Sequence, residues 1–232
     1  MRKIGFIGAY DKTDCMIYIA KILTALGNRV IVVDTTITQK AKYIIPAISP
    51  TIAYVTEFED IDVAVGFSSF SEIKEYLGLS EKTALSYDIA MIDIDSIEAF
   101  EAFDMKTAEK NYFVTSADLY SLRKGLEVLS ALKEPIPMTK VFFSKEMSQE
   151  EDDYLNFLSS TYKVRWEKEK IFFPLETADQ QVIMENQRAA KVKLKELSNE
   201  YKGALLYLTE EISGKASTSE LKRVFRNIEK GV

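Results

Sequence analysis

The sequence predicts an α/β fold in which one doubly wound, mostly parallel sheet carries helices on both faces. Short runs of wholly apolar residues recur along the chain, and longer amphipathic segments separate them. Strands that are apolar on both sides are typical of parallel sheets buried between two layers of helices. Regular alternation of such runs with helical segments favours successive β-α units. The chain has 232 residues, 47% of them hydrophobic, which is enough for the core of one such domain.

Each apolar run is expected to be a strand, and each amphipathic segment a helix. The expected strands are residues 4–7, 30–33, 63–65, 89–92, 112–114, 141–143 and 171–173. The expected helices are residues 13–26, 71–77, 97–109, 119–133, 149–159 and 178–197. A hydroxyl side chain followed three residues later by Glu or Gln marks a helix start, and it occurs at Ser69, Ser148, Thr177 and Ser217. Residues 38–62 contain no readable motif, and we expect a switch-like stretch and a surface connection there.

Residues 1–214 are expected to form the α/β domain, and residues 215–232 a C-terminal amphipathic helix. In this helix Leu221, Val224, Phe225 and Ile228 recur at helical spacing, and the side chains of the segment carry a charge of +3. Such a helix either docks its apolar stripe on the protein body or lies in a membrane interface. We expect docking and keep the membrane surface as the alternative.

Composition excludes several kinds of catalytic and metal site. The chain has no histidine and one cysteine, Cys15, which excludes Ser-His-Asp and Cys-His triads, histidine-ligated zinc and disulfides. The formal net charge of -6 argues against nucleic-acid binding. No apolar stretch reaches the roughly 18 residues of a membrane-spanning helix. A single unpaired cysteine fits a reducing compartment, so we expect a cytoplasmic protein in which Cys15 is a buried core residue.

The first β-α junction has the layout of a phosphate-binding loop. Gly8 opens a short loop after the strand, and Lys12 and Thr13 begin the next helix. In such a junction the loop amides and the helix N-terminus face an anion, Lys adds a positive charge, and Thr can ligate magnesium. The full pattern GxxxxGK[ST] requires glycine where this chain has Asp11. A carboxylate about 4 Å from a phosphate costs about 4 kcal/mol at an effective dielectric constant of about 20, so Asp11 must point away or the site is weak.

Five segments, taken in order, resemble the landmarks of the MinD/ParA class of P-loop ATPases: residues 3–14, 30–36, 87–93, 111–132 and 171–187. The resemblance matches Lys12 to the phosphate-contacting lysine of the family loop KGGxGKTT, and Thr13 to its magnesium-ligating hydroxyl. It matches Asp34 to a switch aspartate, and Asp93 to the aspartate that holds the magnesium shell through water and should lie near Lys12. The nucleotide-binding residues that it implies are Gly8, Ala9, Tyr10, Asp11, Lys12, Thr13 and Asp14, with Pro174 and Glu176 in an adenine-side loop.

The departures from the family pattern concern the groups that hydrolysis needs. The lysine that reaches across the family's nucleotide sandwich dimer falls on Ile7, and a second switch aspartate falls on Thr36. The loop glycine falls on Asp11 and the second hydroxyl on Asp14. Hydrolysis requires a positioned water and stabilisation of charge on the transferring phosphoryl group. The resemblance therefore implies an atypical member with a degenerate loop, which binds ATP and Mg²⁺ weakly or not at all and is not an efficient ATPase.

Three functions remain open. The leading hypothesis is a localisation or assembly switch for a pilus or other cell-envelope machine, because eroded loops are associated with the TadZ/CpaE-type pilus-assembly branch of the family. The second is a nucleotide-free protein-interaction module of the same fold, and the third is an active ATPase in which Asp11 or Asp14 replaces the missing groups. We expect a protein partner, which includes a second copy of the chain in a homodimer, and we expect no nucleic acid. Peripheral contact with a membrane would involve only the C-terminal helix.

Two acidic features are expected at helix starts. Asp95 lies two residues before the helix expected at 97, where a side-chain cap is favourable. The acidic run 150–153 lies in the first turn of another expected helix, where negative charge complements the helix dipole, and we expect it to be solvated.

Overall fold

The computed structural model describes residues 1–47, 51–144, 149–174, 176–214 and 216–230. Within this part of the chain, one eight-stranded sheet has the order β3-β4-β2-β5-β1-β6-β7-β8. Its strands are β1 (Arg2–Ile7), β2 (Val30–Asp34), β3 (Tyr54–Phe58), β4 (Ile61–Val65), β5 (Ile89–Ile94), β6 (Lys110–Ser116), β7 (Ile136–Phe143) and β8 (Val164–Phe172). All neighbouring pairs are parallel except β3 with β4. The predicted doubly wound, mostly parallel sheet is confirmed.

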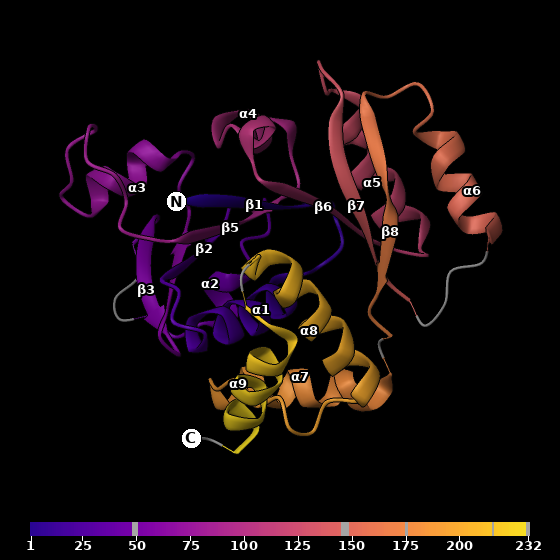
Figure 1. The fold of residues 1–232 in the computed structure, drawn as a ribbon. Coiled ribbons are helices and arrows are strands. Elements are labelled where there is room, and N and C mark those ends of the chain that lie inside the picture. Colours follow the sequence, from indigo (N-terminus) through magenta and orange to yellow (C-terminus); the bar gives the residue numbers. More distant parts are fainter. Residues whose placement is uncertain (48–50, 145–148, 175, 215, 231–232) are drawn as a thin grey trace.

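Helices cover both faces of the sheet (Figure 1). One face carries α1 (Thr13–Ala25), α7 (Thr177–Ala189), α8 (Asn199–Ser213) and α9 (Thr218–Lys230), and the short α2 (Ala41–Ile44) adds one residue to its core. The other face carries α3 (Phe70–Tyr76), α4 (Ile97–Ala102), α5 (Leu119–Ser130) and α6 (Gln149–Leu158). Alternate strand residues enter the two cores: Val30 and Val32 face α1, while Ile31 and Val33 face the opposite side. This alternation explains why the strands are apolar throughout.

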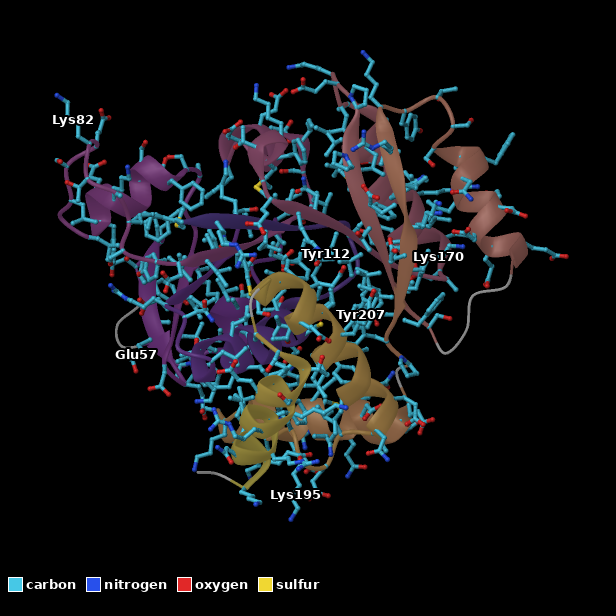
Figure 2. The ribbon with its side chains drawn as sticks, viewed as in Figure 1. Glu57, Lys82, Tyr112, Lys170, Lys195 and Tyr207 are labelled. Carbon is cyan, nitrogen blue, oxygen red and sulfur yellow. The ribbon has the colours of Figure 1, made fainter. Side chains whose placement is uncertain are left out.

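The segment after residue 177 differs from the prediction. The expected helix 178–197 ends at Ala189, and Ala190 adopts a left-handed conformation with φ of 47°. Residues 191–194 then alternate, with exposed Lys191 and Lys193 and buried Val192 and Leu194. Figure 2 shows the nearby Lys195 at the end of the molecule where α7 and α9 lie. A further helix, α8, follows at 199–213 and was not predicted.

Other expected elements are shorter or were missed. The helix expected at 97–109 ends at Ala102 and gives way to a 3-10 turn, Met105–Thr107. Within residues 38–62, the structure places α2 and the edge strand β3, which pairs antiparallel with β4. Ser69 and Ser217 accept bonds from the amides of Glu72 and Glu220 at 3.3 and 3.2 Å, as expected for helix starts. The cap at Thr177 was wrong, because Thr177 is already inside α7, and Ser148 lies outside the described residues.

The acidic run at the start of α6 is only partly solvated, which corrects the expectation. Asp152 is buried and pairs with the buried Lys140 of β7 at 2.6 Å, and Lys170 of β8 bonds its second oxygen. Burial opposes the charge on Asp152, but these lysines outweigh it and hold the pKa of Asp152 below its usual value. The Trp166 ring lies 5.0 Å from Lys140 Nζ and donates Nε1–H to Ser159 at 3.0 Å. These contacts fasten α6 to β7 and β8.

The C-terminal helix α9 docks on the body, as expected. Leu221, Val224 and Phe225 are buried in the core shared with α1 and α8. An ion pair of 2.8 Å joins Lys202 of α8 to Glu229 of α9. The apolar face that interfacial membrane binding would need is therefore covered by protein. Among the helices of the described residues, none combines the length and apolarity that crossing a membrane requires.

Candidate phosphate-binding site

A cavity of about 540 Å³ opens at the carboxyl ends of the central strands, beside the N-terminus of α1. Ligands of open α/β sheets bind at this edge. Six of the predicted loop residues line it together with Asp93. Eight further lining residues come from α5 and from the segments that follow β2 and β5. The lining residues are Gly8, Ala9, Tyr10, Asp11, Lys12, Thr13, Thr36, Ile37, Thr38, Lys40, Tyr43, Asp93, Asp95, Tyr120 and Lys124.

Gly8 allows the chain to turn sharply out of β1. Its φ is +138°, and a Cβ at this position would lie 2.1 Å from the carbonyl oxygen of Val114. The Gly8 amide donates to the carbonyl of Ile94 at 2.9 Å, which anchors the turn to the end of β5. Only glycine fits this conformation and this close approach. The residue therefore sets the loop in place for the lysine that follows.

The Lys12 side chain is buried and turned back into the loop. Its Nζ donates to the Gly8 carbonyl at 2.8 Å and to the Tyr10 carbonyl at 3.4 Å. The same atom lies 2.5 Å from Asp93 Oδ1, and both side chains are almost fully buried. The expected proximity of Lys12 and Asp93 is confirmed. A lysine held this way places its Nζ beside the cavity, where an anionic ligand would enter.

Asp93, the second-last residue of β5, is buried, and its Oδ1 is held among the described residues only by an ion pair. Its Oδ1 makes a close ion pair with Lys12 and accepts no other bond from the described residues. Burial raises the pKa of Asp93 to about 7, and the neighbouring Asp34 adds to this rise while Lys12 opposes it. The cavity thus contains a carboxylate that a cation or a proton would stabilise.

The structure places Asp34 beside the cavity but outside its lining. Oδ1 accepts bonds from the amide and the hydroxyl of Thr36, at 3.0 and 2.6 Å, and Oδ2 accepts one from the Ala41 amide at 2.9 Å. These bonds fold residues 34–41 around the buried carboxylate. Asp34 here organises the segment that ends in α2, and its part in a switch stays a prediction.

Asp11 and Asp14, the two acidic departures, share one cation. Lys40 Nζ bonds Asp11 Oδ2 and lies 2.6 Å from Asp14 Oδ2. Asp11 also accepts from the Thr13 amide at 3.2 Å, and Asp14 accepts from Gln187 of α7 at 3.0 and 2.9 Å. Sequence reasoning missed Lys40, which lies in the stretch without a readable motif. Its place shortly after the end of β2, the strand next to β5, was the available signal.

The predicted adenine-side residues lie apart from this cavity. Pro174 is buried and Glu176 is exposed just before α7, and neither lines the cavity. Leu175 between them lies outside the described residues. Tyr10 connects the loop to this region, because its ring stacks on Phe143 at 4.6 Å and Phe143 stacks on Phe173 at 5.0 Å. The roles of Pro174 and Glu176 stay predictions.

Two other expectations have clear outcomes. Asp95 does not cap α4: it accepts a bond from the Ile37 amide at 3.0 Å, and Ser96 caps the helix through the Ala99 amide at 3.2 Å. Cys15 is buried in the core, and burial raises the pKa of its thiol, as expected for an inert core residue.

The residues present fit a magnesium ion that is held partly by phosphate. Among the described residues, no group of three or more carboxylate or thiol side chains is arranged to hold a metal by itself. Magnesium in phosphate sites takes only one or two protein ligands, and phosphate oxygens and waters complete its shell. Asp93, whose Oδ1 has only Lys12 as a partner among the described residues, and Thr13 at the first turn of α1 are the groups that would hold it. The ion would neutralise phosphate charge.

Comparison of the fold with solved structures gives consistent matches. The complex of MinC and MinD from Aquifex aeolicus matches with a TM-score of 0.61 and 13% identity, covering 94% of this chain and 97% of that chain. The ParA family ATPase of Chlorobium tepidum TLS matches with a TM-score of 0.55 and 16% identity, covering 90% of this chain and 98% of that chain. This chain has the MinD/ParA fold.

A third structure with the MinD/ParA fold was solved with nucleotide. It is a variant of McdA from Cyanothece in complex with ATP, with a TM-score of 0.54 and 11% identity, covering 94% of this chain and 98% of that chain. No family model matches the sequence, and no curated protein matches it. At these identities the likeness shows the MinD/ParA fold alone, and the chemistry of this chain must be argued from its own residues.

Proposed function

We propose that the chain is a nucleotide-binding switch with weak or absent ATP hydrolysis, which positions or assembles a larger machine by binding a protein partner. One observation carries the proposal. The buried Lys12 and Asp93 meet 2.5 Å apart, and both line the cavity beside the loop 8–13. A positive charge for phosphate and a carboxylate for magnesium are thus placed together at the N-terminus of a helix.

The neighbours with the same fold support a nucleotide as the ligand. One of them is a ParA family ATPase, one is the cell division protein MinD in complex with MinC, and one is a McdA variant in complex with ATP. In this chain Lys12 would contact the phosphates, and Thr13 and Asp93 would hold magnesium. The loop backbone and the first turn of α1 would orient the phosphates and exclude water from one side of them.

The missing charges support weak hydrolysis. Ile7, at the position of the lysine that crosses the family dimer, is fully buried in the core beneath the cavity. Thr36, at the second switch position, donates its hydroxyl hydrogen to Asp34 Oδ1 at 2.6 Å. Neither residue supplies a charge or a base to the cavity, so stabilisation of the transferring phosphoryl group is reduced.

Exposed apolar side chains around the cavity support a partner on this face. Ile37, Tyr43, Leu119 and Tyr120 are all exposed, and three of them also line the cavity. Large apolar side chains gathered at one mouth mark a protein-binding surface more often than isolated ones do. A second copy of the chain or another protein would cover them, and nucleotide binding in the cavity beneath would affect the contact. We propose a cytoplasmic location and a cell-envelope machine such as a pilus as its setting.

The first test is calorimetric titration of the purified full chain with ATP and Mg²⁺, beside ADP and GTP. Binding in the micromolar range, with phosphate release no faster than background, supports the proposal. Absence of heat up to millimolar ligand would instead favour a nucleotide-free interaction module. Turnover well above background would favour an active ATPase of altered mechanism, and Asp14→Asn and Asp11→Gly would then identify the carboxylate involved.

A further inference from the structure

The two acidic residues of the loop are neutralised by one lysine from another segment. Lys40 follows β2, and its ammonium bonds both Asp11 and Asp14. Lys40 and Asp11 line the cavity, whereas Asp14, which was also predicted to bind nucleotide, lies outside its lining. Burial by itself would lower the pKa of Lys40, but the two carboxylates outweigh burial and raise it, so the lysine stays charged. The group of three side chains therefore has one negative charge in place of two.

The surrounding bonds fix all three side chains. Gln187 of α7 donates to both oxygens of Asp14, and the Thr13 amide donates to Asp11. The Ala41 amide, next to Lys40, is held by the buried Asp34 at 2.9 Å. The side chains of Asp14 and Lys40 are 13% and 27% exposed, so solvent screens their contact only in part. Asp11 is the more exposed member, at 52%.

Uncompensated carboxylates at this position would oppose an anion. Asp11 and Lys12 are adjacent in the chain, and both line the cavity that would receive a phosphate. Like charges close together disfavour each other strongly where solvent is partly excluded. Lys40 is the described cation that contacts both carboxylates, so it reduces this repulsion.

We propose that Lys40 is a positioning residue for phosphate binding, which keeps the loop competent for an anionic ligand despite Asp11 and Asp14. The inference rests on the proposed function. Lys40 acts through the two aspartates: it halves their net negative charge and ties residues 34–44 to the loop. In this chain it compensates for the loop glycine that Asp11 replaces.

The test is a mutational cycle read by calorimetric titration with ATP and Mg²⁺. We expect Lys40→Ala to weaken binding by at least about tenfold, since it leaves a partly buried charge pair broken. Lys40→Arg should restore most of the affinity, because it keeps the charge. The double variant Asp11→Gly with Lys40→Ala should also regain most of the loss, because the repelling carboxylate is gone. Lys42→Ala is the matched control: Lys42 is exposed, two residues away and outside the cavity, and its loss should have no effect.

Two results would overturn the inference while leaving the proposed function intact. Unchanged affinity in Lys40→Ala would show that the bridge is irrelevant to the ligand. A loss that Asp11→Gly does not relieve would show that Lys40 contacts the phosphates directly. Circular dichroism checks that each variant is folded, and Lys40→Gln, which keeps hydrogen bonding without the charge, replaces Lys40→Ala if that variant does not fold.

If the wild-type protein binds no ATP, titration of the Asp11→Gly variant still tests the inference. Binding by Asp11→Gly would show a competent loop that Lys40 fails to protect, which overturns the inference and keeps the site. If neither protein binds ATP, both the proposed function and the inference are wrong.

Discussion

Asp34 and Asp93 lie side by side in register at the ends of β2 and β5, and their environments are opposite. Asp34 accepts three hydrogen bonds from residues 36 and 41. Among the described residues, Asp93 Oδ1 has no partner besides the ammonium of Lys12, 2.5 Å away. The two buried carboxylates therefore differ in role: Asp34 holds residues 36–41 in place, and Asp93 faces the cavity.

Asp93 predicts an unusual pH dependence of stability. Its pKa is about 7 in the folded protein against 3.8 for an aspartate in water, so the folded state holds an extra proton between these values. The free energy of unfolding should therefore fall as pH rises through this window, instead of rising. Denaturant unfolding at several pH values checks this, and Asp93→Asn should lose the slope. An identical slope in both proteins would contradict the assignment.

Lys12→Ala should abolish ATP affinity. The substitution removes the cavity's most buried positive charge, and we expect a loss of at least about 100-fold. It also leaves Asp93 without its counter-charge, which costs stability at pH 8. Denaturant unfolding of the same variant measures the loss of stability separately from the loss of affinity. Affinity that persists in a folded Lys12→Ala protein would place the ligand elsewhere.

Gly8→Ala should destabilise the protein strongly, by at least about 2 kcal/mol, because strain and overlap act together. The new methyl group would meet the Val114 carbonyl at 2.1 Å, and φ of +138° disfavours alanine. Gly203 is the contrasting control: it is exposed within α8, with open space around its Cβ position. Gly203→Ala should raise stability by about 0.5–1 kcal/mol, since alanine favours helix. Thermal unfolding followed by circular dichroism compares them.

Phe225→Ala should cost about 3 kcal/mol of stability, because the ring is buried under α1 and α8. Arg226→Ala, on the exposed side of the same helix, should change stability by less than about 0.5 kcal/mol. Urea unfolding distinguishes these values. Equal, small effects would mean that α9 is detached in solution.

The docked helix also predicts the outcome of a membrane assay. The full chain and a truncation after Gly214 should pellet equally with liposomes of anionic lipid, because the apolar stripe of α9 is occupied by the core. Co-sedimentation measures this. Stronger pelleting of the full chain would show that α9 leaves the body at a membrane.

Much of the fold could be predicted because burial on both sides leaves a strong signal. The apolar runs at 30–33 and 89–92 lie inside β2 and β5. β3 was missed because it is a partly exposed edge strand, whose residues are mostly intermediate in burial. α8 was missed although Ser198 caps it, because the expected helix at 178–197 ran past the left-handed Ala190, and alanine carries no turn signal.

Only those residues of the candidate site that are close together in the sequence could be predicted from it. Gly8, Lys12 and Thr13 belong to one junction, whose order in the chain already indicates a phosphate loop. The meeting of Lys12 with Asp93 followed from the family resemblance. The pairing of Lys40 with Asp11 and Asp14 joins residues 26 or more positions apart, and it depends on how residues 34–41 fold around Asp34. No local pattern contains that information.

The corner that α6 forms with β7 and β8 gives the protein a built-in optical probe. Trp166 is the one tryptophan of the chain, and its ring contacts Lys140, Phe113 and Ser159. Tryptophan emission therefore reports on this corner, at one end of the sheet, whereas far-ultraviolet ellipticity reports on the whole molecule. If the corner opens before the central strands, emission will change at lower denaturant than ellipticity does, and the two curves will separate.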